Sequence, residues 1–320
     1  MAKQKREKLY CDLMAESNNR LIQALGKISN AEEVYKIVAD DFANQAISKG
    51  VPFDQIESIV KKHMNNTEIK SQMSGLTAIN NWYWGGRQVY RFDKDLAELL
   101  YSQTKSDIEV DSETLTLLPC SHFYIYLEDN IRKGFFVSYS DNVLYISDMG
   151  NDFTFSLGIP IPKGGTMISE IIEDTNAEID NDITPKQISE LSGRISTYMQ
   201  FVVYLSAINA EVEPVTNGSI VIRQAGQKAV TRRNKTEISN VGYRLGEALR
   251  TNKKEKANVK YIGEHEQGSP KSPHIRRSHF HSYWTGSGEN KELIVKWVNT
   301  IFVHGNDNNS DISTVHNVMK

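Results

Sequence analysis

The stretch TPKQISELSGRISTYMQFVVYLSAINAEVEP, residues 184–214, decides the fold. Thr184 offers a hydroxyl cap, and Pro185 occupies the first helical position, where its missing N–H costs nothing. Apolar residues then recur at spacings of three and four, namely Ile188, Leu191, Ile195, Tyr198, Met199, Val202 and Leu205. From 201 to 208 they fill nearly every side, which predicts a long helix at the centre of the core.

Four runs rich in β-branched and aromatic residues precede this helix and predict an antiparallel meander. They are 122–127, 134–139, 142–147 and 152–159. Turn-forming residues at 129–130 and 140–142 allow neighbouring strands to pair through short hairpins.

The N-terminal part has helical periodicity. Helices are expected over 53–63, 75–84 and 93–102, with another opening at 32–38 after Asn30. An apolar stripe is expected at the N-terminus, formed by Leu9, Leu13, Leu21, Leu25 and Ile28.

The predicted fold class is therefore α+β, in three regions. The first, 1–110, is a helical N-terminal region, and the second, 111–220, holds the antiparallel meander with the long buried helix. The third, 221–320, is a basic C-terminal region. It is expected to contain a helix over 237–250, a linker over 251–271 and a β-hairpin over 272–304.

The composition is that of an ordinary soluble protein. The 320 residues are 39% hydrophobic and 24% charged, enough to bury a substantial core. There is no apolar leader and no run of about 18 apolar residues, so we expect a cytoplasmic protein without a membrane partner. Cys11 and Cys120 lie far apart and predict neither a disulfide framework nor a metal site. No cofactor and no small-molecule substrate are expected.

The charge is unevenly distributed. The whole chain has a net charge of −3, but residues 221–300 contain 16 Lys and Arg against 7 Asp and Glu. A basic region on an acidic body favours contact with a polyanion such as RNA or the ribosome, although basic loops are as often simply solvated. Charge alone does not separate RNA, the ribosome and an acidic protein as partners.

The densest group of chemically active residues is PHIRRSHFHSYW, residues 273–284. If this segment is a strand, alternation places Arg277, His279, His281 and Tyr283 on one face. The candidate binding residues of this motif are His274, Arg276, Arg277, His279, His281, Tyr283 and Trp284. The next strand, 292–303, directs one apolar side to the core through Leu293, Val295, Trp297, Ile301 and Val303.

Four interpretations of the motif stay open at this point. Arg and His can bind phosphates while Tyr283 or Trp284 stacks on bases of single-stranded RNA. Alternatively, His279 and His281 act as general acid and base of a metal-independent RNase. A metal site formed by these two residues with His265 or a carboxylate is a third interpretation. In the fourth, Arg and His form a hydrogen-bonding network that locks a loop.

A second unusual cluster is WYWGGR, residues 82–87. Aromatic residues and Arg dominate binding hot spots, so Trp82, Trp84 and Arg87 are candidates to line a peptide-binding groove. The alternative is that these aromatic side chains belong to the core at a helix end.

The run 272–288, continuing to Lys296-Trp297 and 301–303, resembles the C-terminal motif of a type V-A anti-CRISPR family. The known member of that family lowers production of the CRISPR effector nuclease. Similarity continues upstream at 241–247, which resembles the family's Gly-x-Arg-Leu-Gly helix, and fainter likeness lies at 82–93 and 133–135. Ser278 and Phe280 depart from the family motif, which has Gly and Trp there.

The resemblance implies that the protein recognises the nascent N-terminal segment of a CRISPR effector nuclease during translation, followed by loss of the encoding mRNA. It would then come from a phage or mobile element and act by binding rather than catalysis. Its partners would be the nascent peptide, read by the acidic and aromatic body, and the ribosome or mRNA, contacted by the basic region. The alternatives are an RNase using His279 and His281, and an RNA-binding accessory protein unrelated to CRISPR.

Overall fold

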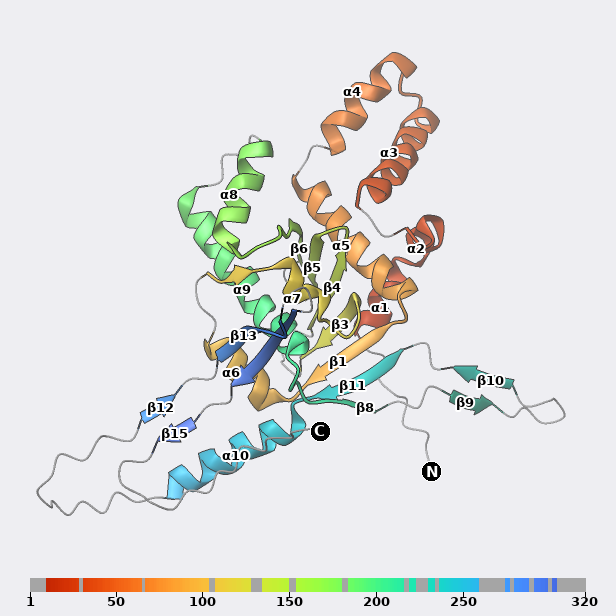
Figure 1. Ribbon diagram of the computed structural model, residues 1–320. Coiled ribbons are helices and arrows are strands. Elements are labelled where there is room, and N and C mark those ends of the chain that lie inside the picture. The colour runs from red at the N-terminus through yellow and green to blue at the C-terminus, as the bar shows by residue number, and fades with distance from the viewer. Residues whose placement is uncertain are drawn as a thin grey trace, which may run out of the picture.

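The computed structural model describes most of the chain (Figure 1). The described residues are 10–28, 31–64, 67–103, 107–127, 134–149, 154–179, 184–215, 219–222, 230–233, 236–258, 274–276, 279–287, 291–298 and 301–303. Within them the fold is α+β, as predicted, with helices on both faces of a central mixed sheet.

The N-terminal helices are α1 (Tyr10–Ser17), α2 (Asn19–Leu25), α3 (Ala31–Ser48), α4 (Phe53–Met64) and α5 (Thr67–Trp84). α5 packs on the sheet, whereas α3 and α4 form a pair that extends away from it (Figure 1). The predicted apolar stripe is wrong at Leu13 and Leu21, which are exposed. Cys11 and Ile22 are fully buried instead, because α1 and α2 are two short helices that turn different sides to the body.

The central sheet has seven strands in the order β6-β5-β4-β3-β1-β11-β8. The predicted meander is confirmed: β3 (His122–Tyr126), β4 (Gly134–Ser140), β5 (Val143–Met149) and β6 (Thr154–Pro160) pair antiparallel in sequence order. Beyond β3 lie β1 (Gln88–Phe92), β11 (Glu237–Val241) and β8 (Val212–Pro214). β1 is parallel to both of its neighbours, so the sheet is mixed and takes strands from all three predicted regions.

The expected helix over 237–250 is wrong in its first part. Residues 237–241 form β11, whose main chain pairs with β1 on one side and β8 on the other. The helix α10 (Tyr243–Asn258) begins only after Gly242, which has a φ of +69°. α10 also extends through the start of the expected linker over 251–271, and the rest of that linker lies outside the described residues.

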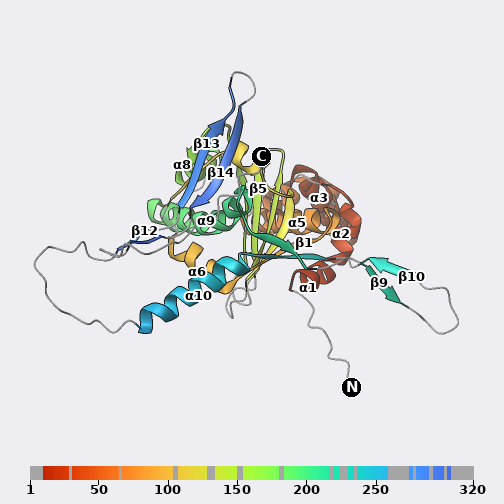
Figure 2. The same ribbon diagram turned by 60° about the horizontal axis from the view of Figure 1, so that its bottom comes forward.

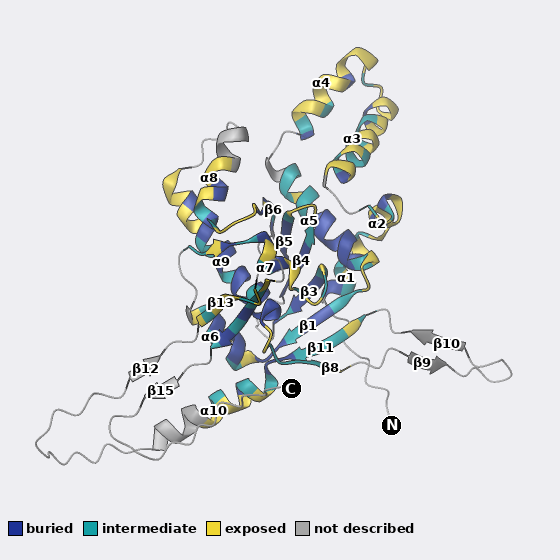
Figure 3. Cartoon of the chain, in the orientation of Figure 1, coloured by how far each residue is buried: buried dark blue, intermediate teal, exposed yellow. Residues whose placement is uncertain are grey.

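The long central helix is confirmed as α9 (Pro185–Ser206). It begins with a capping box, in which the Thr184 N–H donates to Gln187 Oε1 at 2.9 Å and the Gln187 N–H donates to Thr184 Oγ1 at 3.4 Å. Phe201 packs edge-to-face against Phe92, with ring centroids 5.1 Å apart. Figure 3 shows buried residues concentrated in the sheet and in α9, which covers the face opposite α5.

Shorter elements complete the fold. They are α6 (Lys94–Gln103), α7 (Ser112–Thr116) and α8 (Ile168–Ile179), the β2 (Glu109–Val110) and β7 (Thr166–Met167) pair, and the β9 (Ser219–Ile222) and β10 (Val230–Arg233) pair. α6, α7 and α8 all pack against α9.

The predicted C-terminal hairpin is confirmed, in two ladders. β12 (His274–Arg276) pairs with β15 (Ile301–Val303), and β13 (His279–Thr285) pairs with β14 (Glu292–Val298). Val295 and Trp297 are buried, as the apolar alternation predicted. Figure 2 shows β13 and β14 above α9.

The hairpin is joined to the end of α9 by a main-chain hydrogen bond and by the side-chain amide of Asn209. The Ile208 N–H donates to the Val295 carbonyl at 2.8 Å. The Asn209 amide accepts from the Trp297 N–H and donates to the Trp297 carbonyl, both at 2.8 Å. Asn209 thus pairs with Trp297 as a neighbouring strand would.

Replacing Asn209 by Ala removes both hydrogen bonds to Trp297 and should loosen the hairpin. The expected cost is about 1–3 kcal/mol, since each bond contributes about 0.5–1.5 kcal/mol. Hydrogen exchange at the β14 amides should accelerate while the β3–β5 amides keep their protection. Asn44→Ala, at an exposed position of α3, is the matched control. Unchanged β14 exchange in Asn209→Ala would contradict this role.

A buried polar group links α5 to the sheet. Asn81 Nδ2 donates to Ser138 Oγ at 2.8 Å, and His122 Nδ1 lies 3.0 Å from the same hydroxyl. Burial lowers the pKa of His122 below its usual range because the charged imidazole loses solvation.

This lowered pKa predicts a specific pH dependence of stability. The unfolded chain protonates His122 near its ordinary pKa of about 6.5, but the folded chain protonates it only at lower pH. The free energy of unfolding should therefore be maximal above about pH 6.5. It should fall as the pH decreases from there towards the folded-state pKa. Urea unfolding at pH 7.5 and 5.5 should show a smaller loss in His122→Asn than in the wild type. Equal losses in both would refute the assignment.

Candidate functional site

The outer face of the hairpin carries the exposed ring side chains that the motif predicted. His279, His281 and Tyr283 alternate along β13 and are exposed, with the His281 and Tyr283 ring centroids 5.6 Å apart. Lys296 of β14 stands opposite His281. This outer face is a strip of imidazole, phenol and ammonium groups, which suits contacts to planar or anionic partners.

The inner face of the hairpin contributes to the core. Phe280 packs on Trp297, with ring centroids 4.6 Å apart. Trp284 lies on the same side of β13, opposite Leu293 of β14, and is 55% exposed. The aromatic residue at 280 thus anchors the hairpin, and Trp284 is left available to a partner.

The structure does not describe the side chains of the motif's Arg residues. His274 and Arg276 belong to β12, where only the main chain is described, and Arg277 lies outside the described residues. His265, which the metal hypothesis needed, lies outside them as well. Within the described part of the chain, no three His, Cys, Asp or Glu residues are grouped so as to hold a metal ion.

The WYWGGR cluster divides between core and surface. Trp82 is 0% exposed, donates its Nε1–H to the Gln88 carbonyl at 2.8 Å and packs against Phe136. This burial removes Trp82 from the residues that can contact a partner. Trp84 is 37% exposed, and the Arg87 guanidinium lies 3.7 Å from the centroid of the Tyr83 ring.

Tyr83, Trp84 and Arg87 form what we call the α5 patch. It lies at the end of α5, on the opposite side of the sheet from the hairpin (Figure 2). The structure therefore does not bring the two predicted clusters together into one site.

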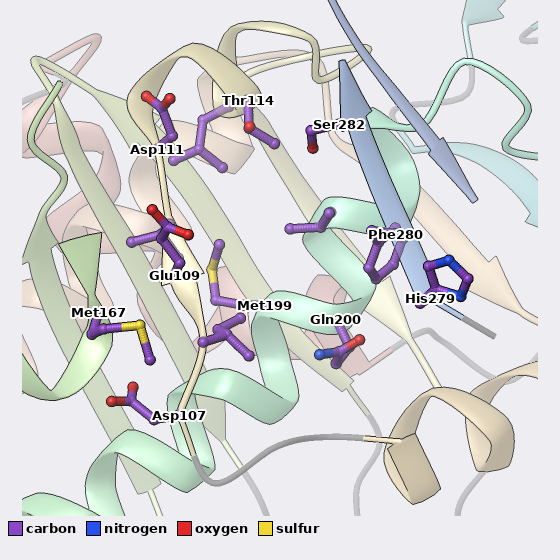
Figure 4. Close-up of a pocket in the computed structure, with 14 residues that line it drawn as sticks. Asp107, Glu109, Asp111, Thr114, Met167, Met199, Gln200, His279, Phe280 and Ser282 are labelled. Atoms are coloured by element: carbon purple, nitrogen blue, oxygen red, sulfur yellow. The ribbon is translucent and has the colours of Figure 1, made fainter. Parts of the chain in front are cut away.

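A groove that sequence reasoning missed lies beside the hairpin (Figure 4). It has a volume of about 450 Å³. Segment 107–111 forms one wall, β13 forms the other through Phe280 and Ser282, and Met199 and Val203 of α9 lie at the floor. The one signal in the sequence was the alternation of acidic residues at Asp107, Glu109 and Asp111.

The acidic wall of this groove is held in place by contacts with the body. Asp107 Oδ1 accepts from the Ser169 N–H at 3.1 Å and from Ser192 Oγ at 2.9 Å. Asp111 caps α7 by accepting from the Glu113 N–H at 2.9 Å. The Glu109 carboxylate lies so close to Gly165 that a Cβ there would be 1.6 Å from Glu109 Oε1.

The described arginines of α10 form ion pairs with carboxylates of the body. Arg244 pairs with Glu213 and lies 3.7 Å from Glu211, whose carboxylate also accepts the Arg244 and Leu245 N–H groups at 3.0 and 3.2 Å. Arg250 Nη1 contacts Asp93 at 2.9 Å and Asp95 at 2.7 Å. Both arginines thus link α10 to the body, Arg250 through the buried Asp93 and Arg244 through exposed ion pairs.

Both glycines of the motif at 242–246 stand where a larger side chain would not fit. A Cβ at Gly242 would lie 2.0 Å from Leu96 Cδ2, and the residue also needs its positive φ. A Cβ at Gly246 would lie 1.8 Å from Asp93 Oδ1. Both allow α10 to approach the start of α6 closely.

Gly246→Ala should therefore push Asp93 away from Arg250 and from the α6 amides that it caps. The expected destabilisation is about 1–3 kcal/mol, the usual cost of overpacking. Urea denaturation measures it. Ala248→Ser, at an exposed position of the same helix, should change stability by less than about 0.5 kcal/mol. If Gly246→Ala were equally harmless, the close contact would be wrong.

Within the described residues, no helix is long and apolar enough to cross a membrane.

Comparison with known proteins identifies the family. The family model "AcrVA2-like: Anti-CRISPR type V subtype A2 family" matches residues 90–305. No curated protein matches the chain. A solved crystal structure of AcrVA2 is similar at a TM-score of 0.45 and 16% identity, covering 93% of this chain and 100% of that one. Because the family model spans well over half of the sequence, this chain belongs to the AcrVA2-like family of type V subtype A2 anti-CRISPR proteins.

Proposed function

We propose that this protein suppresses a type V-A CRISPR system by recognising the nascent N-terminal segment of the effector nuclease at the ribosome and promoting loss of its mRNA. The observation that carries this proposal is the family match over 90–305, which includes the whole hairpin and the 242–246 motif. In this proposal, its partners are the nascent peptide and the ribosome or mRNA, and it acts by binding.

The exposed surfaces support a binding role. Tyr283 and Trp284 are exposed on a hairpin that is anchored to the body by buried Trp297. Aromatic side chains presented in this way are frequent anchors of peptide recognition. The exposure of His279 and His281 also suits contact with a partner better than acid–base chemistry, which works best in a water-excluded site.

Further basic residues of the C-terminal region are candidates to contact a polyanion. Residues 252–258 carry Lys253, Lys254 and Lys256, beyond the arginines that α10 uses internally. We assign ribosome or mRNA contact to these lysines and to Arg276 and Arg277, because they belong to the basic C-terminal region.

The test measures effector transcript and effector protein in cells that carry a type V-A system, with this chain induced. Both should fall severalfold while an unrelated transcript stays constant. Tyr283→Ala/Trp284→Ala and Arg276→Ala/Arg277→Ala should each abolish the effect. Phe53→Ala, which alters an exposed aromatic residue on α4 outside the family match, should not.

Two outcomes would contradict the proposal. If neither transcript nor protein changes, the proposed target is wrong. If His279→Gln/His281→Gln abolishes transcript loss and the purified wild type alone cleaves the transcript, the RNase hypothesis replaces it, because Gln keeps hydrogen bonding but not acid–base capacity.

A further inference from the structure

We propose that the groove between segment 107–111 and β13 binds an extended protein segment, which adds as a β-strand to the free edge of β13. The segment would carry apolar side chains at alternate positions and at least one Lys or Arg. This inference rests on the proposed function only for the identity of the protein that supplies the segment.

The groove lies on an unpaired strand edge. Among the described residues, β13 pairs with β14 alone, and the hairpin residues that line the groove, His279, Phe280 and Ser282, all come from β13. None comes from β14, so the groove borders the edge of β13 that has no partner strand. Figure 4 shows β13 on one side, segment 107–111 on the other and α9 between them.

The opposite wall, segment 107–111, also has main-chain groups that could pair with an added strand. β2 pairs with β7, where Glu109 faces Met167 and the Ile168 N–H donates to the Ile108 carbonyl at 3.0 Å. In an antiparallel pair, neighbouring residues direct their main-chain groups to opposite sides. The Glu109 N–H and C=O therefore point away from β7. An unpaired edge of this kind is a ready template for an added strand.

The apolar floor of the groove favours apolar side chains in the bound segment. In an added strand, every second side chain would point towards α9, where Met199 and Val203 lie, flanked by Met167 and Phe280. Methionine side chains adapt to apolar partners of different shape. The volume of about 450 Å³ falls within the ordinary range of ligand clefts, about 300–1,000 Å³.

The acidic wall of the groove favours a positively charged side chain in the bound segment. Asp107, Glu109 and Asp111 line the groove, and no Lys or Arg is among its described lining residues. The local potential is therefore negative, which attracts a Lys or Arg side chain and repels a nucleic acid. Charge complementarity thus favours a basic peptide strand over an RNA at this site.

The experiment uses the full-length protein and two sets of probes, a random 12-residue peptide library and 12-residue peptides that tile the effector nuclease. The wild type should enrich library sequences with alternating apolar residues and a cation. Glu109→Lys and Ser282→Phe should each weaken the enriched peptides about tenfold or more. Glu173→Lys, the same charge reversal at an exposed position of α8, should leave affinity unchanged. Peptides N-methylated at their backbone amides should also bind about tenfold more weakly, because they cannot extend the ladder.

The outcomes separate this inference from the proposed function. If no library sequence is enriched, or if Glu109→Lys and Ser282→Phe bind as the wild type does, the groove proposal is overturned. If Glu109→Lys and Ser282→Phe bind every peptide as the wild type does and still lower the effector transcript, the groove proposal fails while the proposed function stands. If library peptides bind through Glu109 but effector peptides do not, the groove proposal stands and the assigned partner is wrong.

Discussion

The burial of α9 is the constraint on which the rest of the structure depends. Phe201 meets Phe92 of the sheet, and Tyr204 of the same helix meets Trp297 of the hairpin, with ring centroids 5.7 Å apart. A two-stranded hairpin is at best marginally stable alone in water. The hairpin that carries the family motif is therefore ordered because α9 supplies its missing core, and Asn209 fixes its register against the end of that helix.

A second node at Asp93 holds together parts of the chain that are distant in sequence. Its carboxylate caps α6 through the Asp95 N–H at 2.9 Å and binds Arg250 of α10. Asp93 is almost fully buried, and an unpaired carboxylate there would be costly. The close fit of Gly246 against this group shows that the glycines of the 242–246 motif serve the contact between α10 and α6.

The sequence predicted those features that depend on local signals. The capping box and spacing of α9, and the short turns of the β3–β6 meander, are contained within a few residues of the elements they define. The pairing of β1 with β11 could not be predicted from local signals. Gln88 pairs with Glu237 in a parallel ladder, and the two strands are not connected by a short turn. The same holds for the groove, whose walls come from 107–111 and β13 and whose floor comes from α9. Composition also could not decide that Trp82 is buried while Trp84 is exposed, because one helix turn presents both.

The candidate surfaces differ in whether they lie within the residues that the family model matches. It covers 90–305, so the hairpin, α10 and every wall of the groove lie inside it, whereas Tyr83, Trp84 and Arg87 of the α5 patch lie outside. A property that defines the family must be carried by residues within the match. The hairpin and the groove are therefore better placed to carry the shared anti-CRISPR function.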